Sequence, residues 1–385
     1  MMKMQTTLEN SSLVDAPVVV VGAGLSGLTA AYRLKQLGYA VNVIEARDRV
    51  GGRILGVGND AAHQFDLGPS WFWPSMNPQL THLLDELGLA VFAQHSVGAS
   101  LMEVSATQVR RHESNYSQMS ASMRIVGGTS AITQRLAATL GTDVMLDAQV
   151  EVIETRQQGL RLTVNRAGTL SHIAASAVVL ALPPRVLAQS VSWVPSLADS
   201  QIKQWYRSPT WMAAQAKVVA VYKHAFWRED GLSGDAGSHI GPMVQIHDAS
   251  NESGSVAALF GFVGVPYAWR KTVGEQQLKD DAQAQLVRLY GEKAAAPVAL
   301  YIQDWAGDSL TAVDADRSAR SEHPIPLQFS LPSPWSQQVF FAGSEFAQDV
   351  PGYLEGAVSA ANNAVSRVQQ HVVGGLEAVN GQLGI

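Results

Sequence analysis

The feature that most limits the possible folds of this sequence is a glycine-rich turn between a buried strand and a helix. The apolar run 17–21 (PVVVV) is typical of a strand that is buried on both faces of a parallel sheet. The turn 22–27 (GAGLSG) follows, then an alanine-rich helical pattern to Leu37, then an apolar strand over 40–44 that ends at Glu45. Together these elements predict a βαβ unit of the kind that binds dinucleotides.

Each part of this βαβ unit has a physical reason. Gly22 and Gly24 let the backbone turn sharply and approach a pyrophosphate, which the positive end of the helix dipole favours. Gly27 lets the helix pack closely on the strand, and Glu45 can accept hydrogen bonds from a ribose diol. The alternative is a glycine-rich turn in a sheet that holds no ligand.

Composition removes several classes of function. A net charge of −6 argues against binding to nucleic acid or to anionic lipid, because both require clustered Lys and Arg. The absence of cysteine excludes disulfides, thiolate metal sites, a cysteine nucleophile and a thioether link to a cofactor. We identify no metal site, although composition alone leaves a His and carboxylate site open. With no apolar run long enough to cross a membrane and a polar start, we expect a soluble, cytoplasmic protein.

The order of elements predicts an α/β fold whose sheet domain is assembled from separated segments. A length of 385 residues favours two or three domains. The first βαβ unit lies near the N-terminus, and a buried strand followed by a helix lies near the C-terminus, so the middle of the chain is predicted to be an inserted second domain. The predicted strands are 150–155, 160–165, 177–181, 213–222, 256–263 and 338–342, and the predicted helices are 131–140, 276–291 and 355–372.

Two long motifs carry a resemblance to a known family. The segment 45–53 (EARDRVGGR) places a second glycine pair after the ribose-binding acid, which a nicotinamide enzyme does not need. Together with 19–44 at the N-terminal end and 340–364 (FFAGSEFAQDVPGYLEGAVSAANNA) at the C-terminal end, it resembles the flavin-containing amine oxidases, which include the monoamine and polyamine oxidases. The resemblance extends over 65–78, 125–140, 181–184 and 217–227.

This resemblance implies FAD, bound noncovalently by a Rossmann-like domain of the glutathione-reductase type, with a smaller inserted α+β substrate domain. It implies an FAD domain over 15–72, 127–185 and 336–372, a substrate domain over 73–126 and 186–335, and flexible tails over 1–14 and 373–385. A helix near Gly356 is expected to direct its N-terminal amides at the flavin. The residues expected to bind the cofactor are Gly22, Gly24, Leu25, Ser26, Gly27, Glu45, Ala46, Arg47, Gly52, Arg53, Gly68, Val150, Gly343, Glu345, Gly352, Tyr353 and Ala357.

Lys217 is the first candidate catalytic residue. It lies in the middle of an apolar strand, where burial of an unpaired ammonium is costly, so a partner or a lowered pKa is expected. It matches the lysine of the family that reaches the flavin N5 through a water and assists reoxidation by oxygen. Otherwise Lys217 points to solvent from an edge strand, as we expect of Lys223.

Three aromatic residues match positions near the substrate or the flavin in the family. Tyr353 matches one wall of an aromatic cage, Trp305 a tryptophan packed near the flavin, and Trp71 an aromatic that faces the substrate; a place in the core is the alternative for each. The second cage aromatic is missing, because 306–328 contains no Phe, Tyr or Trp. The segment 73–127 is also shorter than the helical subdomain of larger members, so the pocket is either more open or roofed by the partner in a homodimer.

Histidines have no catalytic assignment. His63, His224 and His247 have no matched carboxylate and are predicted to lie at the surface or to cap helices, and no histidine matches a covalent flavin link. The resemblance implies that a small amine is oxidised to an imine, which hydrolyses to an aldehyde or ketone, while oxygen reoxidises the flavin and gives peroxide. Two alternatives stay open: a desaturase or dehydrogenase of an apolar or cyclic substrate, and a flavin-binding interaction protein without catalysis.

Overall fold

The computed structural model divides the chain into two compact units. It describes residues 16–58, 64–113, 122–317, 323–324, 326 and 331–382. Unit 1 comprises Met1–Gly52, Leu136–Ser208 and Pro324–Ile385, and unit 2 comprises Arg53–Arg135 and Pro209–His323. These bounds differ from the predicted ones: 53–72 and 127–135 fall in unit 2, and 186–208 and 324–335 fall in unit 1. The predicted tail 1–14 lies outside the described residues.

The central element of unit 1 is a parallel sheet of five strands in the order β20-β13-β1-β2-β9. The strands β1, β13 and β20 are fully buried, which explains their uniformly apolar sequences. The helix α1 connects β1 to β2, which pair in parallel, so these elements form the predicted βαβ unit. The bounds are β1 Val18–Val21, α1 Leu25–Gln36, β2 Val41–Ile44, β9 Val144–Met145, β13 Ala177–Leu180 and β20 Val339–Phe341.

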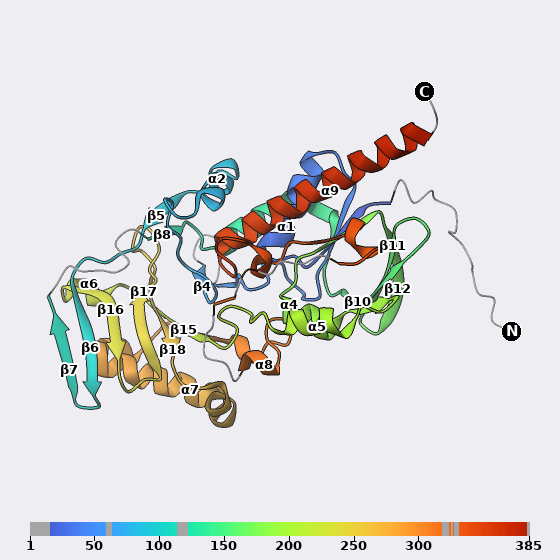
Figure 1. Ribbon diagram of the computed structural model, residues 1–385. Coiled ribbons are helices and arrows are strands. Elements are labelled where there is room, and N and C mark those ends of the chain that lie inside the picture. The colour runs from blue at the N-terminus through green and yellow to red at the C-terminus, as the bar shows by residue number, and fades with distance from the viewer. Residues whose placement is uncertain are drawn as a thin grey trace. The chain divides into compact units, whose positions relative to one another are not determined.

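A second sheet of unit 1 has four strands in the order β12-β11-β10-β14, antiparallel except for the β10–β14 pair. Its apolar face contributes to a core with Trp193, Trp205 and Trp335. The last helix, α9, packs along α1, as Figure 1 shows in red and blue. The bounds are β10 Gln149–Thr155, β11 Leu160–Arg166, β12 Thr169–Ala175, β14 Ser192–Val194, α4 Pro184–Ser190, α5 Asp199–Tyr206 and α9 Leu354–Gln382.

One prediction for unit 1 needs correction. Residues 373–382 continue α9, so the helix extends about ten residues beyond its predicted end at Val372 and the predicted flexible tail is helical there. Ala360, Ala361 and Ala364 are buried in this helix, which packs on α1, and small side chains allow helices to approach closely.

Unit 2 contains a sheet of seven strands in the order β19-β15-β18-β17-β16-β6-β7. The helix α3 (Ser130–Leu140) crosses the division between the units at Leu136. Two small ribbons, β3–β4 and β5–β8, complete the strands. The bounds are β3 Gly56–Val57, β4 Phe65–Asp66, β5 Val91–Ala93, β6 Ala99–Ser105, β7 Gln108–His112, β8 Met123–Ile125, β15 Ala216–Tyr222, β16 Leu232–Ser238, β17 Met243–Asp248, β18 Ala257–Val263 and β19 Ala299–Asp304.

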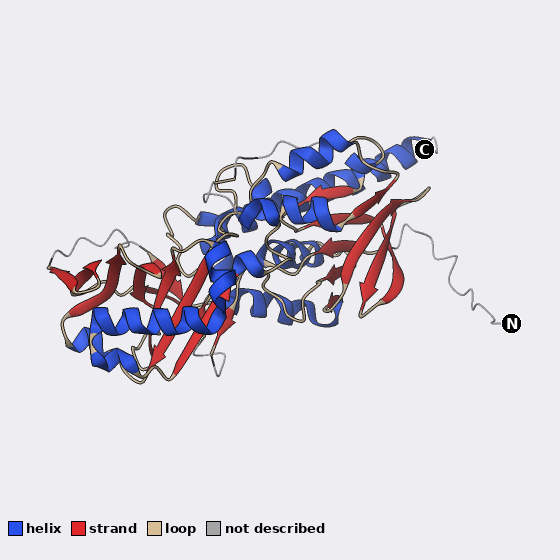
Figure 2. Ribbon diagram, turned by 90° about the horizontal axis from the view of Figure 1, so that it is seen from below, coloured by secondary structure: helices blue, strands red, loops and turns tan. Residues whose placement is uncertain are grey.

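The large sheet of unit 2 has two different faces. One face packs against α7 (Tyr267–Tyr290), which runs across the strand direction in Figure 1 and lies on one side of the sheet in the turned view of Figure 2. The other face carries Val219 and Phe260 and packs against Phe65 and Leu67 of the β4 region. The remaining helices are α2 Pro78–Glu86, α6 Phe226–Glu229 and α8 Asp314–Arg317.

The helix α7 begins earlier than predicted. The sequence predicts a helix from residue 276, whereas α7 begins at Tyr267 after Pro266 and bends at Gly274, which has φ +81°. Gly274 therefore separates a first turn from the amphipathic part of the helix. In the ranges given above, no helix has the length and apolar character needed to cross a membrane.

Candidate active site

The glycine turn of unit 1 has the geometry expected for dinucleotide binding. Gly22 has φ +101°, and a Cβ on Gly27 would lie 1.9 Å from the Gly22 carbonyl oxygen, so both positions require glycine. A Cβ on Gly24 would meet only the Gly51 carbonyl oxygen, at 3.8 Å. The space beside Gly24 at the start of α1 is therefore not filled by unit 1 itself.

The carboxylate of Glu45 holds the glycine turn in place. It is buried, and it accepts hydrogen bonds from the backbone N–H groups of Ala23 at 2.7 Å and of Arg47 at 2.9 Å. The Arg47 guanidinium lies 3.7 Å from it. A carboxylate has about four acceptor positions, so capacity is left for a ribose diol. The predicted role of Glu45 is compatible with this geometry.

The second glycine pair lies directly on the first turn. Gly51 donates a hydrogen bond to the Ala23 carbonyl, and a Cβ on Gly52 would lie 3.3 Å from the Gly24 Cα. Both glycines have positive φ, +106° and +58°. A nearby ligand is the reason predicted for glycine at positions 51 and 52. Contact with the backbone of the first turn is a second reason why these positions are glycine.

The C-terminal motif meets the same turn within unit 1. The Ser26 hydroxyl donates to the Ala342 carbonyl, which links the start of α1 to the end of β20. A Cβ on Gly343 would lie 2.5 Å from the Leu182 carbonyl oxygen, and the Glu345 carboxylate is completely buried. The Ser26–Ala342 contact joins residues 316 positions apart in the sequence.

The remaining predicted residues of unit 1 surround this region of the chain. Val150 is buried at the start of β10, and the backbone N–H groups of Asp147 and Ala148 donate to the carbonyls of Arg47 and Glu45. Gly352 has φ +86°. Tyr353 is exposed, with 41% of its surface accessible, and desolvation raises the pKa of its phenol. The helix α9 begins at Leu354, one residue before the predicted start at Glu355.

FAD fits the donors that unit 1 presents. The N-terminus of α1 has no side-chain cap and no acidic residue in its first turn, so its amides and positive dipole end are suited to a pyrophosphate. The open space beside Gly24 lies at this end of the helix. Arg53 and Gly68 were predicted with this group but belong to unit 2, where a Cβ on Gly68 would lie 2.1 Å from the Arg53 carbonyl oxygen.

Lys217 is buried in unit 2, on an interior strand. Only 3% of its surface is accessible, and β15 lies between β19 and β18, which excludes the alternative of an exposed lysine on an edge strand. Its Nζ donates to the Gly68 carbonyl at 3.0 Å and to Ser70 Oγ at 2.6 Å, and it lies 3.9 Å from the centre of the Phe260 ring. Lys223 is exposed, as predicted.

Burial controls the protonation of Lys217. Desolvation lowers the pKa of its ammonium to about 7; Asp66 opposes this shift and buried Arg124 adds to it. Asp66 is itself committed to the backbone N–H and the hydroxyl of Thr129, at 2.8 and 2.7 Å. Lys217 can therefore bind or release a proton near neutral pH, which an ordinary lysine with a pKa near 10.5 cannot do.

The segment 67–71 of unit 2 connects three of the four predicted catalytic residues. Its Gly68 and Ser70 hold Lys217, its Leu67 carbonyl accepts a hydrogen bond from the Trp305 indole at 3.0 Å, and it ends in Trp71. Trp305 is buried, and Trp71 is half-buried. The fourth residue, Tyr353, belongs to unit 1.

Aromatic rings of β18 and β17 surround Trp71 and Lys217. The Trp71 ring lies 5.0 Å from Phe260, 6.3 Å from Phe262 and 4.9 Å, edge to face, from His247. Its indole N–H donates to Gln94 Oε1 at 2.8 Å. Phe262 lies opposite Lys217 in the β15–β18 register, so these side chains share one face of the sheet.

One histidine prediction is wrong. His247 was described as having no matched carboxylate, but its Nδ1 lies 2.9 Å from Asp235 Oδ1 on the adjacent strand β16. The partner was missed because strand pairing, not sequence spacing, brings it there. His224 is exposed, as predicted, and His63 lies outside the described residues.

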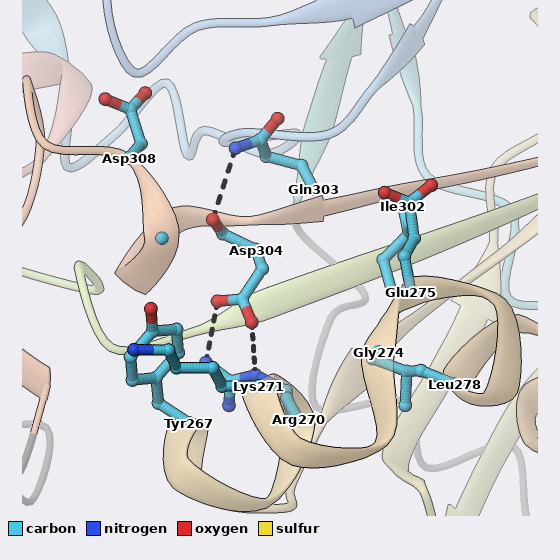
Figure 3. A pocket seen from close by; sticks show the side chains of 11 residues that line it. Tyr267, Arg270, Lys271, Gly274, Glu275, Leu278, Ile302, Gln303, Asp304 and Asp308 are labelled. Atoms are coloured by element: carbon cyan, nitrogen blue, oxygen red, sulfur yellow. Dashed lines mark hydrogen bonds and ion pairs between the residues drawn. The ribbon is translucent and has the colours of Figure 1, made fainter.

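A pocket of about 430 Å³ lies between α7 and the end of β19, and Figure 3 shows its side chains. Its central feature is an ion pair in which Arg270 contacts both carboxylate oxygens of Asp304, at 2.7 and 2.8 Å. Arg270 also donates to the carbonyls of Val265 and Ala214. We assign this pair a structural role, because it fixes the strand end that precedes Trp305.

Ser70, Phe260, Phe262 and the Asp235–His247 pair were not predicted as site residues. Ser70 lies in the matched segment next to Trp71, so the resemblance could have indicated it. The alternation of Phe260 and Phe262 indicates one face of a strand. No sequence signal indicates that this face is shared with Lys217.

Comparison with known proteins identifies the family. Residues 91–369 match the family described as "Flavin containing amine oxidoreductase", and residues 20–87 match the family described as "NAD(P)-binding Rossmann-like domain". The chain is 23% identical to a protein named probable flavin-containing monoamine oxidase A of Dictyostelium discoideum, over 91% of this chain and 96% of that protein. It is 25% identical to putrescine oxidase of Kocuria rosea, over 80% of this chain and 85% of that protein.

Solved structures show the same fold. Putrescine oxidase bound to putrescine has a TM-score of 0.77 at 24% identity and covers 92% of this chain and 99% of its own. Cyclohexylamine oxidase of Brevibacterium oxydans IH-35A has a TM-score of 0.75 at 21% identity, over 93% and 99%. The predicted α/β fold class is confirmed. Because the family match covers well over half of the sequence, the chain belongs to the flavin containing amine oxidoreductase family and is an FAD-dependent oxidoreductase.

Proposed function

We propose that the chain oxidises a small amine to an imine and uses O2 as the electron acceptor, with noncovalent FAD. The observation that carries this proposal is Lys217, which is buried against Gly68, Ser70 and Phe260 with a pKa of about 7. An interaction protein would gain nothing from a buried titrating lysine that a neutral side chain would not supply. The names of the relatives, which include monoamine and putrescine oxidases, support an amine substrate.

The overall reaction balances atoms and electrons. The amine loses two electrons and two hydrogens, one from the carbon and one from the nitrogen, and becomes an imine. Oxygen takes up both electrons and both protons and becomes hydrogen peroxide, and water then converts the imine to a carbonyl compound and free amine or ammonia. FAD, when bound, supplies the two-electron redox chemistry that no side chain provides.

We assign three roles to residues of this chain. The turn at Gly22 and Gly24 and the carboxylate of Glu45 hold the pyrophosphate and ribose of FAD. Trp71 orients the amine by its aromatic face, as we propose from its half-buried position. Lys217 Nζ carries a proton near neutral pH and delivers it to the reduced oxygen.

Several residue roles remain predictions. These are Tyr353 as a wall of the substrate cage, Trp305 as a tryptophan beside the flavin, and the cofactor contacts of Ala46, Arg47, Arg53 and Gly68. A cytoplasmic location and a homodimer have the same standing.

An anaerobic amine panel tests the proposed function. Purified protein is mixed with primary and secondary amines of different length, and the visible absorbance of the flavin is followed. We expect at least one amine to bleach the flavin, and readmission of air to restore the colour and release peroxide. If no amine bleaches the flavin, the assignment to amine oxidation is wrong, and a desaturase or dehydrogenase of an apolar substrate takes its place.

A further inference from the structure

A hydrogen-bonded acid–histidine pair lies beside Trp71 in unit 2. Asp235 of β16 and His247 of β17 are 2.9 Å apart, from Oδ1 to Nδ1, and their side chains are 23% and 16% accessible. The His247 ring lies 4.9 Å from Trp71, edge to face, and 5.4 Å from Phe260. Phe260 in turn lies under Lys217 Nζ, so one aromatic ring separates His247 from the lysine.

The pair leaves one ring nitrogen as an acceptor. A carboxylate can only accept hydrogen bonds, so the proton between the two residues is on His247 Nδ1. In the neutral ring Nε2 is then an acceptor. Within the described part of the chain, no hydrogen bond to this Nε2 is present, and it is not among the fully buried polar atoms without a partner.

The two neighbouring acids have different partners. Asp248, the next residue, is paired with Arg228 through two contacts of 2.8 and 2.9 Å. For Asp235, His247 is the ion-pair partner among the described residues. The Asp235 carboxylate therefore acts through His247 beside a half-buried aromatic face, and an acid at this place favours a hydrogen-bond donor or a cation.

We propose that the Asp235–His247 pair determines substrate specificity by binding the far end of the amine. His247 Nε2 accepts a hydrogen bond from an N–H or O–H group that the substrate carries away from the oxidised carbon. The preferred substrates are therefore amines with a second polar group and an apolar spacer that lies along Trp71. This inference rests on the proposed amine oxidation and on Trp71 facing the substrate.

Three amines with the same carbon chain test the inference on the holoenzyme. They are pentylamine, its ω-hydroxy analogue and its ω-amino analogue, which differ only at the far end. In the unchanged protein we expect kcat/KM to be at least about tenfold higher for the substituted amines than for pentylamine. Equal or lower values for both substituted amines would overturn the proposal.

Matched variants separate the acceptor from packing. His247→Phe keeps a ring against Trp71 and Phe260 but removes Nε2, so we expect the preference for the substituted amines over pentylamine to disappear, chiefly through a higher KM for the substituted amines. His247→Gln retains an acceptor and should restore part of the preference. Asp235→Asn removes the negative charge of the carboxylate, so it should weaken the binding of the ω-amino substrate, seen as a higher KM, more than that of the ω-hydroxy substrate.

Two results distinguish the failures. If all three substrates decline together in His247→Phe at unchanged flavin content and thermal midpoint, the pair has only a packing role and the inference is wrong. If the unchanged protein shows no flavin bleaching with any amine, the proposed function fails instead. A preference that survives in His247→Phe also contradicts the inference.

Discussion

The two units use different kinds of atoms at the places that we connect with function. In unit 1, the turn around Gly22 and Gly24 is built from backbone, and Glu45 is bound by backbone amides. In unit 2, the corresponding place is built mainly from side chains: Lys217 is held by Ser70 as well as by the Gly68 carbonyl and packs on Phe260, and His247 is paired with Asp235. A backbone site fixes which cofactor binds, whereas a side-chain site can change its substrate by single substitutions.

The predicted consequence is that substitutions separate the two roles. Changes in unit 1 should alter the flavin content, and changes in unit 2 should alter kinetics at constant flavin content. Four such effects are expected, from the largest to the smallest.

The largest effect is expected for Gly24→Ala. The added Cβ meets only the Gly51 carbonyl oxygen at 3.8 Å, and Gly24 has an ordinary φ of −72°, so the polypeptide can fold. The methyl group occupies the space in which we place the pyrophosphate, so the retained flavin should decrease by more than about tenfold. The ratio of visible to ultraviolet absorbance measures the flavin content of the purified protein. Gly307→Ala, in open space and without a positive φ, is the control, and equal flavin content in the two variants would contradict this placement.

The second prediction concerns Lys217→Met. Removal of a proton donor at the reacting centre costs on the order of 10²-fold, so the rate of reoxidation by O2 should decrease by about this factor. Stopped-flow absorbance after anaerobic reduction measures it, and the flavin content should not change. Lys223→Met replaces an exposed lysine close in the sequence and should reoxidise at the normal rate. A normal rate in Lys217→Met as well would remove the proposed role.

The third prediction is a pH dependence of stability. Burial lowers the pKa of Lys217 from its ordinary value of 10.5 to about 7, so between these values the unfolded chain binds more protons than the folded one. The free energy of unfolding of the unchanged protein should rise with pH across this window, by up to about 1.4 kcal/mol per pKa unit. Lys217→Met lacks this rise. Urea unfolding of both proteins from pH 6 to 11 tests it, and parallel profiles would show that Lys217 is not desolvated.

The smallest effect is expected for Ser70→Ala. It removes a hydrogen bond of 2.6 Å to the Lys217 ammonium, worth about 1 to 2 kcal/mol, and disfavours the charged form. The pKa of Lys217 should fall further, which moves the pH profile of reoxidation to lower pH. Ser70→Thr keeps the hydroxyl and serves as control. An unchanged profile in Ser70→Ala would mean that Gly68 alone positions the amine.

Much of unit 1 could be predicted because its signals are local. The elements β1, α1 and β2 follow one another within thirty residues, and each was predicted within three residues of its observed bounds. The burial of Lys217 could also be predicted, because an apolar strand surrounds it on both sides in the sequence. The glycines 51 and 52 were recognised, although their contact with Gly24 was not.

The partners in unit 2 could not be predicted, because they depend on strand register and on long-range packing. Ser70 is 147 positions from Lys217, and Trp305 reaches Leu67 across 238 positions. Asp235 and His247 are near in sequence, but only the antiparallel β16–β17 pairing brings their side chains together. The extension of α9 was missed because the glycines at 374 and 375 suggested an end of the helix, which intrinsic propensity alone does not decide.

We propose that electrons from an amine pass through the bound FAD to oxygen. The most direct test is the stoichiometry of a single reaction with an amine that bleaches the flavin, in which carbonyl product, consumed O2 and released peroxide are measured together. We expect equal amounts of carbonyl product, consumed O2 and released peroxide. Carbonyl product without O2 consumption or peroxide would show that a different acceptor reoxidises the flavin, and would contradict the role assigned to Lys217.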